Sequence, residues 1–99
     1  MTKNNKKILI VEDDQFLMSL LKIKLSAHDF TVLTAFDAEE AFAVLEKEQV
    51  ACILLDLLLP GVDGFSVLER LRDSERFKSI PVIVISNLGA AEEKKKALG

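Results

Sequence analysis

Four short apolar runs, separated by longer segments with helical spacing, constrain the fold of this 99-residue chain more than any other feature. The runs cover residues 8–11, 31–35, 52–55 and 82–85. Three of them are continuous rather than alternating, which is typical of strands that a parallel sheet buries on both faces. The run at 31–35 contains two threonines, and we expect it at an edge of the sheet.

The segments between and after the runs predict four helices. Apolar residues recur at helical spacing over 15–27 and 65–71, and Asp37 with Glu40 three residues later forms a capping box that starts another helix. A fourth helix is expected over 90–98, where acidic residues precede basic ones as the helix dipole favours. The residues expected to face the core are Leu17, Leu20, Leu21 and Leu25 in the first helix, Ala41, Phe42 and Leu45 in the second, and Phe65, Leu68 and Leu71 in the third.

Strands that alternate with helices of this length predict right-handed crossovers and one α/β domain over residues 1–99, built on a doubly wound parallel sheet. An apolar content of 49% with a net charge of −3 excludes a disordered chain. The single cysteine, Cys52, allows no internal disulfide and suits a cytoplasmic protein. No apolar run approaches the roughly 20 residues of a membrane span. The mildly acidic balance, without Trp or Tyr, indicates no direct binding to nucleic acid.

Carboxylates follow two of the predicted strands. Glu12, Asp13 and Asp14 come directly after the first, and Asp56 follows the third. Open α/β sheets bind ligands where the carboxyl ends of parallel strands meet, so we expect Glu12, Asp13 and Asp56 to converge if the first and third strands are neighbours. Their oxygen ligands favour Mg²⁺ over Ca²⁺. The alternative is that Asp13 or Asp14 only caps the next helix, although both roles can coexist. The Ser86 hydroxyl, after the fourth strand, is expected to lie beside Asp56 if the fourth strand neighbours the third.

Three segments resemble the receiver (phosphoacceptor) domain of bacterial two-component response regulators. They are residues 7–14 (KILIVEDD), 54–64 (LLDLLLPGVDG) and 80–86 (IPVIVIS), in the family's order and with similar spacing, and the resemblance covers essentially the whole chain. It implies a flavodoxin-like (CheY-like) fold with strand order 2-1-3-4-5, an order that is known for the chemotaxis regulator of this family. It also implies a signalling domain rather than an enzyme, with a sensor histidine kinase or a phosphotransfer protein as partner.

The resemblance assigns roles to five positions of this sequence. Asp56 matches the aspartate that accepts a phosphoryl group from a kinase phosphohistidine. Asp13 matches the direct Mg²⁺ ligand, Glu12 matches its acidic neighbour that acts through water, and Leu58 matches the residue whose backbone carbonyl binds the metal. Mn²⁺ is expected to substitute for Mg²⁺. Ser86 matches the Ser or Thr that donates a hydrogen bond to the phosphoryl group.

The sequence departs from the family pattern after the predicted fourth helix. The family has a fifth strand carrying a lysine near the acceptor site, followed by a fifth helix, and neither is expected before Gly99. Lysines 94–96 lie in the predicted fourth helix and are not expected to replace that lysine. We therefore expect a receiver domain that is incomplete at the C-terminus, truncated to four βα units, with impaired phosphorylation and with self-association through the fourth strand, residues 82–85.

Two alternatives to a phosphate-accepting signalling domain remain at this point. A haloacid-dehalogenase-like Mg²⁺-dependent phosphatase also uses an Asp at a strand end, but it needs a second Asp two residues later, where this sequence has Leu58. The other alternative is a receiver-like interaction module that is never phosphorylated.

Overall fold

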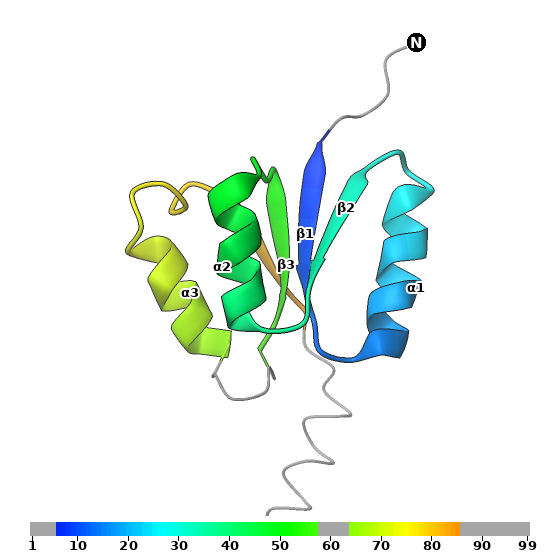
Figure 1. Cartoon of the computed structure of the whole chain (residues 1–99), viewed down its shortest axis with the longest axis horizontal. Helices are drawn as coiled ribbons and strands as arrows, with labels where there is room; N and C mark the ends of the chain where they lie inside the picture. The colour runs from blue at the N-terminus through cyan, green and yellow to red at the C-terminus, as the bar shows by residue number, and fades with distance from the viewer. Residues whose placement is uncertain (1–5, 58–63, 86–99) are drawn as a thin grey trace, which may run out of the picture.

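The computed structural model describes residues 6–57 and 64–85, which form four strands and three helices in alternation (Figure 1). The elements are β1 (Lys7–Val11), α1 (Gln15–Ser26), β2 (Thr31–Ala35), α2 (Ala38–Lys47), β3 (Cys52–Asp56), α3 (Gly64–Arg72) and β4 (Val82–Ile85). These bounds confirm the four predicted strands to within one residue at each end, and they confirm the first three predicted helices. The predicted fourth helix lies outside the described residues.

The strands form one parallel sheet in the order β2-β1-β3-β4. Figure 1 shows α2 and α3 on one side of the sheet and α1 on the other, as right-handed crossovers require when the chain winds first one way and then the other. The chain reverses its winding between β1 and β3. This arrangement is the flavodoxin-like fold that the sequence predicts.

The register of the central strands fixes which residues meet at the carboxyl edge. Val11 of β1 pairs with Leu55 of β3 and with Ala35 of β2. The next residue along β1 is Glu12, and the next along β3 is Asp56, so these two residues occupy adjacent positions at the end of the sheet. Parallel pairing therefore brings together side chains that lie 44 positions apart in the sequence.

The core is centred on β1 and β3, as their continuous apolar runs predict. Leu9, Ile10 and Leu55 are fully buried. On the side of α2 and α3, an aromatic contact joins the helices to the segment before β4: the rings of Phe42 and Phe77 lie 6.4 Å apart. The Arg70 guanidinium stacks over the Phe42 ring at 3.9 Å.

The prediction of which helical residues face the core is partly wrong. In α1 the buried residue is Met18, whereas Leu20 is half exposed. In α3 the core face consists of Gly64, Val67 and Leu71, and Phe65 points to solvent with 59% exposure. Three-residue and four-residue spacings define several overlapping faces, and only packing against the sheet selects one of them.

Strand β4 also differs from the prediction that it is buried on both faces. Ile83 is 56% exposed and Val84 is 43% exposed. Within the described residues β4 is the last strand of the order, so it packs against β3 along one side only. At the other end of the sheet, the partly exposed β2 confirms the predicted edge position.

Candidate functional site

Three carboxylates converge at the carboxyl edge of the sheet, as the sequence predicts. One oxygen from each of Glu12, Asp13 and Asp56 lies within 4.8 Å of the others. Glu12 and Asp13 follow β1 directly, and Asp56 is the last residue of β3. The cluster thus occupies the end of the two central strands, at the point where the winding of the sheet reverses.

Asp14 takes the capping role, which leaves its two neighbours for the cluster. Its Oδ1 atom accepts hydrogen bonds from the backbone N–H groups of Phe16 at 2.9 Å and Leu17 at 3.1 Å, so Asp14 is the N-cap of α1. Both roles weighed for the run Glu12-Asp13-Asp14 therefore coexist: one residue caps the helix and two face Asp56.

The position of Glu12 is fixed by its backbone and by its side chain. Its N–H donates to the carbonyl of Ala35 at the end of β2, at 3.0 Å. Its Oε2 accepts from the N–H of Asp14, also at 3.0 Å. Glu12 is 2% exposed and Asp56 is 7% exposed, whereas Asp13 lies at the surface. The site consequently has a buried acidic floor and one solvent-facing carboxylate.

The pKa of Glu12 is raised from 4.5 to about 8, and burial is the largest cause. Hydrogen bonding of its carboxyl with Asp56 and Asp13, which requires a proton, and the nearby charge of Asp56 contribute to this rise, while the hydrogen bond from the Asp14 backbone opposes it. Glu12 therefore retains its proton near neutral pH, chiefly because burial disfavours its charged form. A divalent cation would compensate the negative charge of the carboxylates.

The chemistry of these donors fits a hard divalent cation. All three side chains offer carboxylate oxygens, and none offers the nitrogen or sulfur ligands that softer metals prefer. Three protein ligands leave room for water and a further ligand, which suits Mg²⁺ better than the larger ligand shell of Ca²⁺. Glu12, Asp13 and Asp56 are the residues that would hold the ion.

Gly64 fixes the chain immediately after Asp56. Its N–H donates to the carbonyl of Leu57 at 3.1 Å, so the start of α3 is bound to the residue next to Asp56. A Cβ atom on Gly64 would lie 2.3 Å from the Leu57 Cα and 2.8 Å from the Leu57 carbonyl atoms. Only glycine permits this approach of two backbones. The Asp-Gly pair at residues 63–64 is a turn signal in the sequence, but it gives no sign of this contact.

The remaining predicted site residues, Leu58 and Ser86, lie outside the described residues, so their roles stay predictions.

The fold and the acidic edge together define a class: a doubly wound α/β domain with a strand-end aspartate beside an acidic pair. Residues 8–99 match the family model described as "Response regulator receiver domain". The chain therefore belongs to the response regulator receiver family, as the three sequence segments suggested. Receiver domains are signalling domains that accept phosphoryl groups, and they are not conventional enzymes.

Relatives and solved structures agree with this assignment. The chain is 40% identical over 88 residues to the DNA-binding dual master transcriptional regulator RpaA of Synechocystis sp., with 89% of this chain and 36% of that protein covered. It is 37% identical over 95 residues to the alkaline phosphatase synthesis transcriptional regulatory protein PhoP of Bacillus subtilis, with 96% and 38% covered. It thus spans about a third of the length of these two relatives.

Among solved structures, the chemotaxis response regulator CheY4 of Vibrio cholerae aligns with a TM-score of 0.80 at 26% identity, covering 97% of this chain and 82% of that one. The phosphorylated cyanobacterial phytochrome response regulator RcpA aligns with a TM-score of 0.77 at 31% identity, covering 94% and 75%. None of the helices in the described part of the chain is long and apolar enough to cross a membrane.

Proposed function

We propose that this chain accepts a phosphoryl group on Asp56 from the phosphohistidine of a sensor histidine kinase or a phosphotransfer protein. The observation that supports the proposal is the convergence of Asp56 with Glu12 and Asp13 at the carboxyl edge of the central strands. In the transfer, a carboxylate oxygen of Asp56 forms a bond to phosphorus as the bond from phosphorus to the histidine nitrogen breaks, and the nitrogen recovers a proton.

Glu12, Asp13 and Asp56 hold Mg²⁺ in this proposal, with the Leu58 carbonyl as a further ligand, and Mn²⁺ substitutes for it. When bound, the cation neutralises charge on the transferring phosphoryl oxygens and on the cluster. The chain's own contribution is to orient the carboxylates: the hydrogen bonds of Glu12 to Ala35 and Asp14 hold its backbone and side chain in place. Ser86 donates a hydrogen bond to the phosphoryl group.

Incubation of the 99-residue chain with acetyl phosphate and Mg²⁺, followed by intact-mass measurement, tests this proposal. We expect one phosphoryl adduct, lost in Asp56→Asn and retained in the neighbouring control Asp14→Asn. Repeated turnover of acetyl phosphate without an adduct would instead favour the phosphatase alternative. No adduct and no turnover, in a folded protein, would favour the unphosphorylated interaction module.

The exposure of β4 supports a second proposal, which concerns self-association. Ile83 and Val84 are uncharged, β-branched and about half exposed, and such a strand edge readily pairs with another chain. Two chains pairing through β4 would form a symmetric dimer. Light scattering over a concentration series tests it, with Val84→Lys as the variant expected to remain a monomer. A wild-type mass that stays monomeric at all concentrations would contradict the proposal.

A further inference from the structure

A cavity of about 590 Å³ opens at the amino-terminal ends of the strands, at the edge opposite the acidic cluster. Its walls come from the start of β1, from the turn between α2 and β3, and from the segment between α3 and β4. Figure 1 shows these three segments at the upper edge of the sheet, whereas the chain leaves β1 and β3 toward the acidic cluster at the lower edge. The volume lies in the range of small-molecule sites, and the phosphoacceptor function uses none of these residues.

The floor of the cavity is apolar and fixed. Leu45, Val50 and Phe77 line it, and each of them is at least nine-tenths buried. Phe77 is held by two hydrogen bonds from its N–H to Ser74, one to the carbonyl at 3.2 Å and one to Oγ at 3.3 Å. Because the floor residues belong to the core, the cavity keeps its shape without a bound ligand.

The rim of the cavity carries more positive than negative charge. Lys6, Lys7 and Arg76 line it, against a single lining carboxylate, that of Glu48. The Arg76 guanidinium lies 5.2 Å from the centre of the Phe77 ring, so a rim cation stands over the aromatic ring of the floor. Arginine stacks on flat π systems and also binds carboxylates through paired N–H groups.

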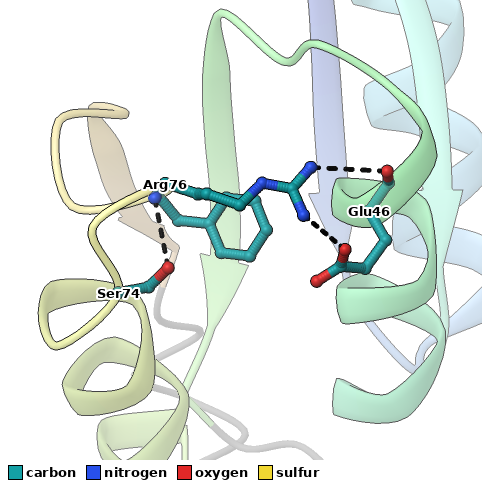
Figure 2. A network of polar contacts seen from close by, with 4 residues as sticks. Glu46, Ser74 and Arg76 are labelled. Atoms are coloured by element: carbon teal, nitrogen blue, oxygen red, sulfur yellow. Dashed lines mark hydrogen bonds and ion pairs between the residues drawn. The ribbon is translucent and has the colours of Figure 1, made fainter.

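Lys7 and Arg76 are engaged in ion pairs that a ligand can replace. Lys7 pairs with Glu48 at 2.6 Å, with both side chains 38% exposed. Arg76 reaches across to Glu46 of α2, where it contacts the carboxylate and, at 3.5 Å, the backbone carbonyl (Figure 2). The side chains of Arg76 and Glu46 are 61% and 58% exposed. Ion pairs this exposed contribute little to stability, so releasing them costs little when a ligand carboxylate takes their place.

We infer that this cavity is a binding site for a small organic anion with a flat apolar body, such as an aromatic monocarboxylate. The body would lie on the floor formed by Leu45, Val50 and Phe77, and the carboxylate would face Lys7 and Arg76. The site is independent of the phosphoacceptor cluster, because the two occupy opposite edges of the sheet.

Amide NMR of the nitrogen-labelled 99-residue chain, titrated with naphthalene-2-carboxylate, tests the inference. We expect saturable shifts confined to the cavity segments, with a dissociation constant on the order of 1 mM for a ligand of this size. Arg76→Met and Lys7→Met, which keep the aliphatic stem and remove the charge, should each weaken binding by about tenfold. The matched control is Lys78→Met, because Lys78 follows Phe77 directly but does not line this cavity.

Two further ligands test the apolar floor and the charged rim separately. Naphthalene-2-carboxamide has the flat body without the charge, and acetate has the charge without the body, so both should bind at least about tenfold more weakly. Binding that survives both Met substitutions would overturn the inference, and so would shifts spread over the acidic edge or equal binding of the carboxamide. The same spectra report whether each variant is folded, so a loss of binding in a folded variant supports the inference.

Discussion

The substitution Asp13→Asn is expected to stabilise the metal-free protein while removing its response to Mg²⁺. Asp13 contributes the exposed carboxylate of the cluster, and its ligand oxygen lies within 4.8 Å of that of Asp56. Two unit charges at that separation repel by about 3.5 kcal/mol at an effective dielectric constant of about 20, and by about 0.9 kcal/mol in water. Because Asp13 faces solvent, the gain should lie near the lower value, about 1 kcal/mol.

Bound Mg²⁺ is expected to reverse the order of stability of the wild type and Asp13→Asn. At ten times its dissociation constant, a ligand that binds only the folded state stabilises it by about 1.4 kcal/mol. The wild-type chain should gain this amount, and Asp13→Asn should gain little because one of three ligands is lost. The variant is therefore the more stable protein in EDTA, and the wild type matches or exceeds it in Mg²⁺.

Urea unfolding at pH 7.5, followed by far-ultraviolet circular dichroism because the chain has no Trp or Tyr, measures both effects. Asp14→Asn is the matched control: it makes the same change of charge one residue away, Asn caps helices as well as Asp does, and Asp14 is outside the cluster. It should leave the Mg²⁺ response intact. If Asp13→Asn destabilises the metal-free protein, or if it responds to Mg²⁺ as the wild type does, the account of the site given above is wrong.

Three further predictions address other features of the molecule. The raised pKa of Glu12, about 8 against 4.5, means that the folded state binds more protons than the unfolded state between these values. The metal-free unfolding free energy should therefore fall as pH rises from about 4.5 to 8, by at most about 1.4 kcal/mol per pH unit from this group, and Glu12→Gln should flatten the profile in urea titrations. Gly64→Ala should lower the free energy of unfolding by about 1–3 kcal/mol because the new Cβ meets the Leu57 backbone, even though alanine favours helices. The same variant should bind Mg²⁺ more weakly in calorimetry. Asp29 has a φ of 66°, so Asp29→Gly should raise the melting temperature by relieving about 0.5–1 kcal/mol of backbone strain. Asp29→Ala should lower the melting temperature, and equal effects of the two substitutions would contradict a backbone cause.

The elements of this fold could be predicted because their signals are local. The continuous apolar runs at β1 and β3 require burial on both faces, and the N-cap residues Asp14 and Asp37 mark helix starts by hydrogen bonds to residues two or three positions away. The first of the two hydrogen bonds of the predicted capping box is confirmed, since the Asp37 side chain accepts from the Glu40 N–H at 2.8 Å. The second differs: Glu40 Oε1 accepts from Phe36, one residue before the cap, at 3.3 Å.

The convergence of the site could be predicted for a similar reason. Parallel strands end at one edge, so carboxylates placed after β1 and β3 meet whenever the two strands are neighbours. That β1 and β3 are neighbours came from the resemblance and was confirmed by the observed order. The preference of these residues for a hard cation could be predicted from the sequence alone, because it belongs to the residue types rather than to their arrangement.

Tertiary structure alone decided which faces of the helices and strands are buried and how the surroundings shift the pKa of Glu12. The burial of Met18 rather than Leu20, and the exposure of Phe65 and Ile83, depend on which neighbours occupy each side of a helix or strand, and residue spacing does not encode that. The raised pKa of Glu12 comes from its desolvation beside two carboxyls, one of them 44 positions away in the sequence. Burial and electrostatic coupling are properties of the assembled layers, so they appear only once the sheet and its helices have packed.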